Sequence, residues 1–517
     1  MIVTGRRSVR SLLEHRNEST PESIFLEWQD QAITYRTLNE RVNRLANGLL
    51  DLGVRKGDRV MIHLPNCPEF IYSFFALLKI GALAVLSNIN NVLEELSYTL
   101  SHSTSSFVIT ESEYYELLKK AQEQIPTLKG IVLTDAEEDF SNAIPMRRIM
   151  AQYPPVLKPI ELSAEDDACI LYTSGTSGRP KGVLYTHGNL VFAGGVNSKE
   201  FRLAPNDRYL CVIPLFHQNG LNHQLLPAVT TGASMVLFRK FSASKFGDQL
   251  REYNITVISV PAPLLRFILN TPEKPSDSQN SLRMLCSGAN MLTKQEFERA
   301  TRRFQVTITN WYGSTESVTC ALRMPLDGKR KDGSIGLPIL GYEFCIFDEN
   351  DREVPEGQIG EIVARGLQYA IMKGFYKDPE ATDATLKNGW LHTGDLGYMD
   401  GDGYFYFVDR KKDMIKVGAE NVAAPEVEMV LNQHPKVKES AVIGVSDNLG
   451  NEAIKAFIVL RAGEDATESE LREYCAQKMS KFKVPKYFEF RTDFPKTAVG
   501  KIEKKTLRKM EKDKNKK

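Results

Sequence analysis

The sequence predicts an α/β protein with a large N-terminal domain of mixed, mainly parallel sheets flanked by helices. Two observations predict this fold. In residues 37–52, leucine and valine recur near one face of a helix, and a turn then leads into the apolar run 59–62. The same change from helix to strand recurs at 78–86 and at 246–260. Alternating helices and apolar strands favour parallel pairing, because each helix can carry the chain back to start the next strand.

The chain changes character after about residue 330, where Gly, Asp and Asn turns separate short apolar runs. These runs, at 341–347, 360–365 and 403–408, predict a β-rich subdomain. The charged run 409–413 follows a strand and is predicted to be a linker. Beyond it, a helix and two strands predict a small α+β module, at 425–432, 441–445 and 453–460. We therefore divide the chain into domains 1–410 and 411–517.

The composition is that of a globular protein without a dominant charge. The 517 residues are 42% hydrophobic, with 66 Lys and Arg against 65 Asp and Glu. The net charge of +1 argues against a protein that binds nucleic acid through bulk charge. Seven cysteines without a CxxC pair favour a reducing cytoplasmic location over a disulfide framework or a zinc site. The most apolar stretch, 72–86, is too short and too charged for an integral membrane segment. The basic tail 501–517 is typical of a solvated helix end.

The strongest local signal is the run LYTSGTSGRPKG at 171–182, which follows an apolar strand. Small residues let backbone N–H groups approach an anion, and hydroxyl and ammonium groups add further donors. The pattern indicates a polyphosphate site formed by Thr173, Ser174, Gly175, Thr176, Ser177, Gly178 and Lys181. It differs from a Walker P-loop, since Pro180 stands directly before the lysine. A flexible surface loop is the alternative.

Three weaker clusters follow along the chain. The run NWYGSTE at 310–316 follows a strand-like run at 305–308. In it, an aromatic ring beside glycine can stack on a planar base, and a carboxylate can hold Mg²⁺. In GWLHTGD at 389–395, an aspartate after a tight glycine turn can accept both hydroxyls of a ribose. In PKTAVGKI at 495–502, a lysine after a glycine turn can meet developing phosphate charge. Each cluster alone is equally typical of an ordinary turn or of a solvent-facing side chain.

Taken together and in this order, the clusters TSGTSGRPKG, YGSTE, GWLHTGD, a strand ending in DR at 409–410 and a C-terminal GKI resemble the adenylate-forming superfamily. That superfamily holds acyl-CoA and aryl-CoA synthetases, adenylation domains of peptide synthetases and firefly-type luciferases. The resemblance extends over residues 38–508. It implies an AMP-binding domain over 1–410 and a mobile C-terminal domain with a catalytic lysine over 411–517. It also implies that ATP, Mg²⁺ and coenzyme A are used to turn a small carboxylic acid into its thioester.

The resemblance implies a role for each matching residue around the nucleotide. Residues 173–181 would hold the β- and γ-phosphates, and Gly288 and Ala289 would line the base and acyl pocket. Tyr312 would stack on adenine beside Gly313. The remaining assignments concern the reacting phosphate, the metal and the ribose: Thr315 would contact the α-phosphate, Glu316 would hold Mg²⁺, Asp395 and Arg410 would grip the ribose, and Lys501 would be the catalytic lysine.

Family members alternate two poses of the small domain. The resemblance places the hinge at Lys412, two positions after the strand-ending arginine. It places the tunnel for the thiol at the loop that holds Gly418, Ala419 and Glu420. Family members often carry two glycines before this glutamate, and the methyl group of Ala419 would narrow the tunnel.

The run PLFHQNG at 214–220 matches the segment that gates the acyl pocket of CoA ligases. The resemblance assigns to this pocket Phe216, His217, Asn219, Gly220 and Trp311. His217 would lie near the reacting carboxylate, with a structural core histidine as the alternative. The stretch after Phe216 lacks the aspartate with which peptide synthetases bind an α-ammonium group, which favours plain carboxylic acids.

Several scaffold segments look most similar to crotonobetaine/carnitine–CoA ligases, at 63–71, 452–457 and 481–485, and a fatty acid–CoA ligase is the other close resemblance. The leading interpretation is therefore an AMP-forming acid–CoA ligase of carnitine or fatty acid metabolism, with a homodimer as one option. An enzyme that loads an acyl or aryl carrier protein is the alternative in the same class. A kinase-like ATPase and a non-catalytic nucleotide-binding protein are the alternatives in other classes.

Overall fold

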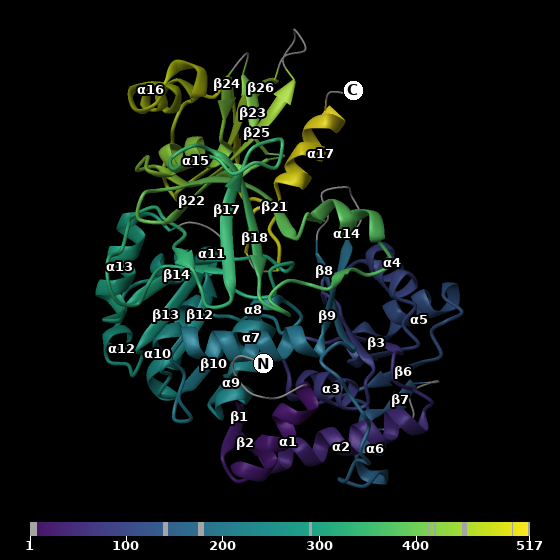
Figure 1. Cartoon of the computed structure of the whole chain (residues 1–517). Helices are drawn as coiled ribbons and strands as arrows, with labels where there is room; N and C mark the ends of the chain where they lie inside the picture. Colours follow the sequence, from purple (N-terminus) through teal and green to yellow (C-terminus); the bar gives the residue numbers. More distant parts are fainter. Residues whose placement is uncertain are drawn as a thin grey trace. The chain divides into compact units, whose positions relative to one another are not determined.

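The computed structural model describes residues 8–137, 143–173, 180–288, 292–411, 413–417, 420–446, 452–498 and 500–514. The chain divides into two compact units, which are described separately below (Figure 1). The larger unit holds Met1–Glu343 and Ala364–Leu391, and the smaller unit holds Phe344–Val363 and His392–Lys517. The domain boundary after Arg410 stays a prediction from the sequence.

One sheet of the larger unit has nine strands, and the six strands from β14 to β1 in its spatial order form five parallel pairs. The central strands are apolar and buried along their length, as expected where helices cover both faces. In spatial order the strands are β16 (Leu337–Pro338), β15 (Leu322–Arg323), β14 (Ile308–Tyr312), β13 (Met284–Gly288), β12 (Val257–Pro261), β10 (Arg208–Cys211), β11 (Ser234–Leu237), β1 (Ile24–Trp28) and β2 (Gln31–Thr34).

The second sheet of the larger unit has eight strands and is parallel except for two antiparallel pairs formed by β9. The apolar run predicted at 59–62 is its central strand β3. In spatial order the strands are β19 (Gly374–Phe375), β9 (Lys181–Thr186), β8 (Asp167–Thr173), β4 (Leu83–Leu86), β3 (Arg59–His63), β5 (Phe107–Thr110), β6 (Gly130–Leu133) and β7 (Ala143–Pro145).

Helices cover these two sheets (Figure 1). The predicted amphipathic helix is α2, which starts after the N-cap Thr34 and buries its leucine and valine face. The described helices are α1 (Val9–Ser19), α2 (Tyr35–Asp51), α3 (Pro68–Lys79), α4 (Leu93–Ser103), α5 (Tyr115–Gln124), α6 (Met146–Gln152), α7 (His187–Glu200), α8 (Gln218–Gly220), α9 (Leu226–Thr231), α10 (Phe246–Glu252), α11 (Ala262–Leu269), α12 (Pro275–Ser278), α13 (Lys294–Phe304) and α14 (Pro379–Thr385), with a π-helical turn η2 (Leu221–Leu225) between α8 and α9.

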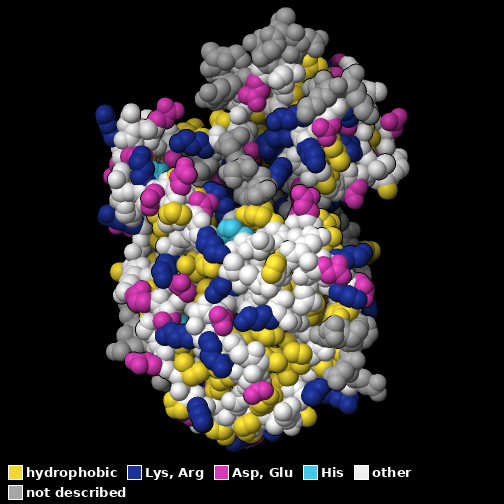
Figure 2. All heavy atoms as spheres, turned by 90° about the vertical axis from the view of Figure 1, so that its right-hand side faces the viewer, with side chains coloured by type: hydrophobic (Ala, Val, Ile, Leu, Met, Phe, Trp, Pro, Cys, Tyr) yellow, Lys and Arg dark blue, Asp and Glu magenta, His cyan; other side chains and the backbone are white. Residues whose placement is uncertain are grey.

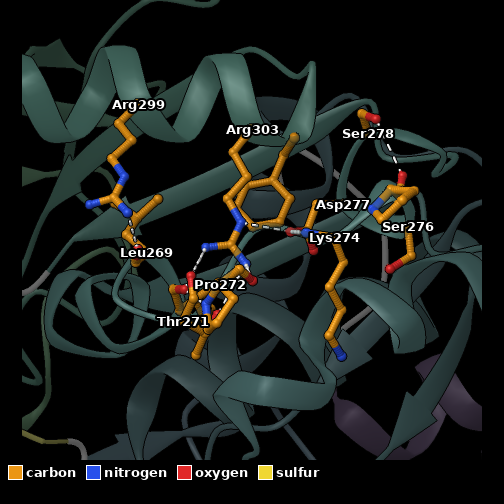
Figure 3. A network of polar contacts seen from close by, with 12 residues as sticks. Leu269, Thr271, Pro272, Lys274, Ser276, Asp277, Ser278, Arg299 and Arg303 are labelled. Atoms are coloured by element: carbon orange, nitrogen blue, oxygen red, sulfur yellow. Dashed lines mark hydrogen bonds and ion pairs between the residues drawn. The ribbon is translucent and has the colours of Figure 1, made fainter.

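A buried ion pair fixes α13, the helix that precedes β14, against the chain around α12 (Figure 3). Arg303 Nε lies 2.8 Å from Asp277 Oδ2, and both side chains are 3% exposed. The guanidinium also donates to the carbonyl oxygens of Ile268, Thr271 and Pro272. These bonds satisfy its donors, which is the condition under which a buried charge is tolerated.

The smaller unit begins within a five-stranded sheet and continues into a three-stranded sheet and a short hairpin. Its core lies between α15 and β25 and β26, where Val427, Leu431 and Val442 are fully buried. The helices and strands from residue 342 on that are not yet named are β17 (Tyr342–Phe347), β18 (Gly360–Gly366), β20 (Leu386–Lys387), β21 (Trp390–Met399), β22 (Phe405–Arg410), β23 (Ile415–Val417), β24 (Glu420–Val422), α15 (Ala424–Asn432), β25 (Val437–Ser446), β26 (Glu452–Leu460), α16 (Glu468–Lys478), β27 (Tyr487–Arg491) and α17 (Lys504–Lys514).

The predicted fold class is confirmed, since mixed and mainly parallel sheets flanked by helices are followed by a β-rich region and a small α+β unit. The basic tail forms α17, which buries Leu507 and pairs Lys504 with Glu428. Figure 2 shows acidic and basic side chains interspersed over one face of the molecule. Among the described residues, no helix combines the length and the apolar character needed to span a membrane.

Candidate functional site

Strands β8 and β9 hold the ends of the predicted phosphate loop. Thr173 ends β8, Lys181 begins β9, and the two residues are register partners. The Thr173 hydroxyl donates to the Lys181 carbonyl oxygen at 3.5 Å, and Lys181 Nζ lies 4.9 Å from the ring centroid of Phe375. Antiparallel pairing thus closes the loop at its base. The predicted phosphate ligands Ser174, Gly175, Thr176, Ser177 and Gly178 lie outside the described residues.

The second cluster lies at the end of β14, where the chain folds back tightly. A Cβ atom on Gly313 would stand 2.4 Å from the carbonyl oxygen of Thr319, so the close backbone approach requires glycine there. The hydroxyl of Ser314 accepts from Ser317 N, and the hydroxyl of Ser317 accepts from Ser314 N. These reciprocal bonds fix the backbone that carries Thr315 and Glu316.

The β9 strand anchors this second cluster through Tyr185, a residue that the sequence analysis did not identify. The buried Tyr185 hydroxyl donates to the Thr315 carbonyl oxygen at 2.5 Å. Burial raises the pKa of Tyr185, and the negative charge of Glu316 raises it further, so the phenol stays protonated and remains a donor. Met372 N donates to the Glu316 carbonyl oxygen at 2.9 Å. The phosphate-loop strand and the cluster at 312–316 are therefore joined directly.

The PLFHQNG segment forms a turn followed by α8 and contacts the same cluster. Gln218 Nε2 donates to the Ser314 carbonyl oxygen at 2.9 Å, a link that the sequence analysis also did not predict. His217 precedes α8, and its ring centroid lies 4.7 Å from that of Phe216. A Cβ atom on Gly220 would meet the Pro214 carbonyl oxygen at 2.6 Å. The predicted acyl-pocket segment therefore lies beside the predicted nucleotide segment.

Gly288 and Trp311 face each other at the ends of β13 and β14, where they are register partners. A Cβ atom on Gly288 would stand 2.4 Å from the Trp311 ring, so glycine makes room for the indole. The ring of His223, from the π turn η2, meets the Trp311 ring edge-on, with centroids 4.7 Å apart. Ala289 lies outside the described residues.

In the smaller unit, the structure brings together three residues that the sequence analysis assigned to the ribose and to catalysis. Asp395 on β21 and Arg410 on β22 are register partners, and Arg410 Nε lies 3.4 Å from Asp395 Oδ1. Lys501 follows Gly500, whose φ of +78° is the expected turn. Burial and the charge of Arg410 lower the pKa of Lys501 to about 8, while the charge of Asp395 acts in the opposite direction. Lys501 thus shares an electrostatic environment with both partners.

Glu361 on β18 is a further acidic residue of this region that sequence reasoning missed. Its carboxylate accepts from Gly394 N at 2.9 Å and lies 3.4 Å from Lys411 Nζ. It thereby holds the turn before Asp395. The sequence pattern at 360–365 predicts only a turn and a strand. It does not indicate that the Glu361 side chain contacts β21.

Two clusters lie on different elements from those expected. Residues 310–312 were expected to follow a strand, but they form the end of β14 itself. Asp395 was expected directly after a turn, but it lies inside the ten-residue strand β21, with Gly394 at a φ of +71°. Pairing with β22 extends the strand through the local turn signals.

The residues expected to move or to admit the thiol are only partly described. Lys412, Gly418 and Ala419 lie outside the described residues. Glu420 begins β24, which pairs with β23 in a two-stranded hairpin. The hinge and tunnel assignments stay predictions.

Comparisons with known proteins show the family of the chain. The family model described as "AMP-binding enzyme" matches residues 13–376, and that of the "AMP-binding enzyme C-terminal domain" matches residues 426–501. A crotonobetaine/carnitine–CoA ligase of Salmonella heidelberg is 41% identical over 485 residues, which cover 92% of this chain and 93% of the relative.

Two solved structures are similar to this chain over nearly its whole length. The structure of an anthranilate CoA ligase in complex with anthranoyl-AMP has a TM-score of 0.90 at 28% identity, covering 99% of this chain and 98% of that chain. An O-succinylbenzoate coenzyme A synthetase from Bacillus subtilis, in complex with ATP and magnesium ion, has a TM-score of 0.84 at 31% identity, covering 96% and 99%. The resemblance found in the sequence is therefore confirmed.

Proposed function

Since the chain belongs to the AMP-binding enzyme family, we propose that it is an AMP-forming carboxylic acid–CoA ligase. It activates a carboxylate with ATP to an acyl-adenylate, releases pyrophosphate and transfers the acyl group to CoA. The observation that carries the proposal is the grouping of Lys501 with Arg410 and Asp395 in one unit. The two cationic side chains suit the anionic reactants of an adenylation, and the carboxylate of Asp395 can accept the hydroxyl groups of a ribose.

The first half-reaction joins two anions, so the chain must supply positive charge and alignment. We assign to Lys181 and the loop at 173–178 the β- and γ-phosphates. Thr315, on the backbone fixed by Tyr185 and the serine pair, contacts the α-phosphate. Lys501 donates hydrogen bonds to the substrate carboxylate and to the α-phosphate, which neutralises the repulsion as the new bond forms.

We assign Mg²⁺ to Glu316, whose backbone is held by Met372 and whose neighbour Tyr185 stays protonated. Among the described residues, no group of three or more His, Cys, Asp and Glu side chains could form a complete cage for a metal ion. The single carboxylate of Glu316 fits Mg²⁺, which is commonly held by one or two carboxylates together with waters and substrate phosphates. The ion supplies charge neutralisation at the phosphates.

The remaining assignments concern the base, the ribose and the acyl group. Tyr312 stacks on adenine beside Gly313, and Asp395 and Arg410 hold the ribose. The acyl group lies among Phe216, His217, Asn219, Gly220 and Trp311, with Gly288 and Ala289 at its border. Lys412 is the hinge of the second half-reaction, and Gly418, Ala419 and Glu420 line the path of the CoA thiol. A cytoplasmic location and a homodimer remain part of the proposal.

The experiment is an acid panel with ATP and Mg²⁺, assayed for pyrophosphate release with and without CoA. The panel includes carnitine and crotonobetaine, because the Salmonella relative is a crotonobetaine/carnitine–CoA ligase, together with medium-chain fatty acids and aryl acids. We expect pyrophosphate with at least one acid and consumption of free CoA. Pyrophosphate release without any consumption of CoA would favour the carrier-protein alternative. ADP as the nucleotide product would refute the proposal.

A further inference from the structure

One face of the nine-stranded sheet and the segment over it hold a group of buried polar side chains, each with at least one hydrogen-bonding atom that has no partner in the described part of the chain. These atoms are the Tyr209 hydroxyl, Asn219 Nδ2, both ring nitrogens of His223, Gln224 Oε1, the Ser259 hydroxyl and Trp311 Nε1. Each of these six residues is at most 8% exposed. A buried polar atom without a partner lowers the stability of a protein, so such a group calls for an explanation.

The strand residues of this group share one face of the sheet. Ser259 is the register partner of Cys286, and Gly288, two residues further along β13, is the partner of Trp311. Because side chains alternate along a strand, Ser259 and Trp311 point to the same side. Tyr209 is the register partner of Val257, which lies two residues before Ser259. The Tyr209 side chain therefore points to the same side of the sheet.

The π turn η2 lies over this face and supplies His223 and Gln224, and the preceding helix α8 supplies Asn219. Gln224 Nε2 donates to the Ser259 carbonyl oxygen and to Asn219 Oδ1, both at 3.0 Å. His223 packs edge-on against Trp311. A π turn is a rare departure from the α-helix that is frequent at functional sites. Here it brings two consecutive polar residues, His223 and Gln224, against this face of the sheet.

The chemistry of the group is polar but uncharged. None of the six side chains carries a formal charge at neutral pH, because burial lowers the pKa of His223 to about 3. The indole N–H of Trp311 and the amide nitrogen of Asn219 can only donate, the Gln224 oxygen can only accept, and the remaining groups can do either. A hydrocarbon chain satisfies none of them. A hydroxyl group, which donates once and accepts twice, can bond to both kinds.

We propose that this group, which we call the polar acyl face, binds a hydroxyl group of the substrate, so that the enzyme prefers a short hydroxycarboxylic acid to the matching unsubstituted acid. The inference rests on the proposed function, because Trp311 and Asn219 belong to the assigned acyl pocket. It adds Tyr209, His223, Gln224 and Ser259 as specificity residues. The Trp311 ring, which lies against Gly288, limits the depth of the pocket and excludes long chains.

The test compares acids that differ only by a hydroxyl group: 3-hydroxybutanoate with butanoate, and carnitine with γ-butyrobetaine. Octanoate represents the long chains. We expect the hydroxylated acid to have a kcat/KM at least about tenfold higher in the pair that is turned over, because a site built to bond a hydroxyl rejects the analogue that lacks it. Equal rates within the pair, a preference for the unsubstituted acid, or octanoate as the best substrate would overturn the inference.

Variants connect the preference to the polar acyl face. His223→Phe keeps a ring against Trp311 and removes both nitrogens, and Ser259→Ala removes one hydroxyl. Both variants should reduce the ratio of kcat/KM between the hydroxylated and the unsubstituted acid at least about threefold. Continued turnover of the unsubstituted acid shows that the variants fold. The matched control is Ser287→Ala. Ser287 is equally buried and its hydroxyl also has no described partner, but it is the register partner of Val260 and faces the opposite side.

The outcomes separate this inference from the proposed function. A preference that survives both His223→Phe and Ser259→Ala, or that is lost equally in Ser287→Ala, would refute the role of the polar acyl face. Pyrophosphate release with unsubstituted acids alone would refute the inference and leave the ligase assignment intact. If no acid releases pyrophosphate, the proposed function fails, and the inference fails with it.

Discussion

Arg410 and Asp395 stand opposite each other on neighbouring antiparallel strands, with 3.4 Å between Arg410 Nε and Asp395 Oδ1. The two residues affect Lys501 in opposite directions, since the charge of Arg410 lowers the pKa of Lys501 and that of Asp395 raises it. Burial is the larger cause, and the resulting pKa is about 8. The protonation of the proposed catalytic lysine therefore changes within the pH range of ordinary assays.

We expect the rate of adenylation at saturating ATP to fall as the pH rises through about 8, because the reaction needs the protonated form of Lys501. Arg410→Gln removes the positive charge and should move this decline to higher pH. Asp395→Asn removes the negative charge and should move it to lower pH. Pyrophosphate exchange from about pH 6.5 to 10 measures all three profiles. Shifts in the same direction for both variants would contradict the assignment.

Lys501→Ala should reduce formation of the acyl-adenylate by about 10²–10³, the usual cost of removing one well-aimed donor in a transition state. Formation of the thioester from a supplied acyl-adenylate should persist, because that step no longer involves the ATP phosphates. The matched control is Lys505→Ala on α17, whose side chain is exposed and which should leave both rates near those of the parent. An equal loss in both half-reactions would refute the separate role of Lys501.

Glu316→Gln should raise the Mg²⁺ concentration needed for half the maximal rate by about tenfold or more, because a neutral amide coordinates the ion more weakly than a carboxylate. The fold should be retained, since the backbone of Glu316 rather than its side chain is bonded to Met372. Titration of the activity with Mg²⁺ measures the effect. Glu343→Gln, in an exposed pair with Arg365, is the control. Identical titrations for the two variants would contradict the metal assignment.

Asp277→Ala should lower the free energy of unfolding of the larger unit by about 3–5 kcal/mol, because it leaves the Arg303 charge buried without a counter-ion. Urea unfolding followed by tryptophan fluorescence reports on this unit, which contains Trp28, Trp311 and Trp390. Glu22→Ala breaks an exposed pair with Arg36 and should cost less than about 1 kcal/mol. Equal effects of the two variants would show that the buried pair contributes no more than a surface pair.

The elements with a clear hydrophobic period could be predicted from the sequence, and those set by distant contacts could not. Helix α2 and strand β3 follow directly from the spacing of their apolar residues. Strand β21 was obscured by Gly394, because its length depends on pairing with β22 rather than on local propensity.

Some residues of the candidate site could likewise be predicted from the sequence, and others could not. Thr173, Lys181 and the cluster at 312–316 were predicted from glycine-rich runs after strands. Tyr185, Gln218 and Glu361 were missed because their importance comes from bonds to backbone atoms far away in the sequence. The π turn η2 was equally invisible, since the bonds from Gln224 that fix it reach Ser259, thirty-five residues further along the chain.

The identity of the nucleotide product tests the central claim most directly. The protein is incubated with ATP, Mg²⁺, CoA and the best acid of the panel, and the nucleotides and thioesters are separated and quantified. The account predicts AMP, pyrophosphate and acyl-CoA in equal amounts, with no AMP formed when the acid is left out. ADP and inorganic phosphate in place of AMP and pyrophosphate would contradict it.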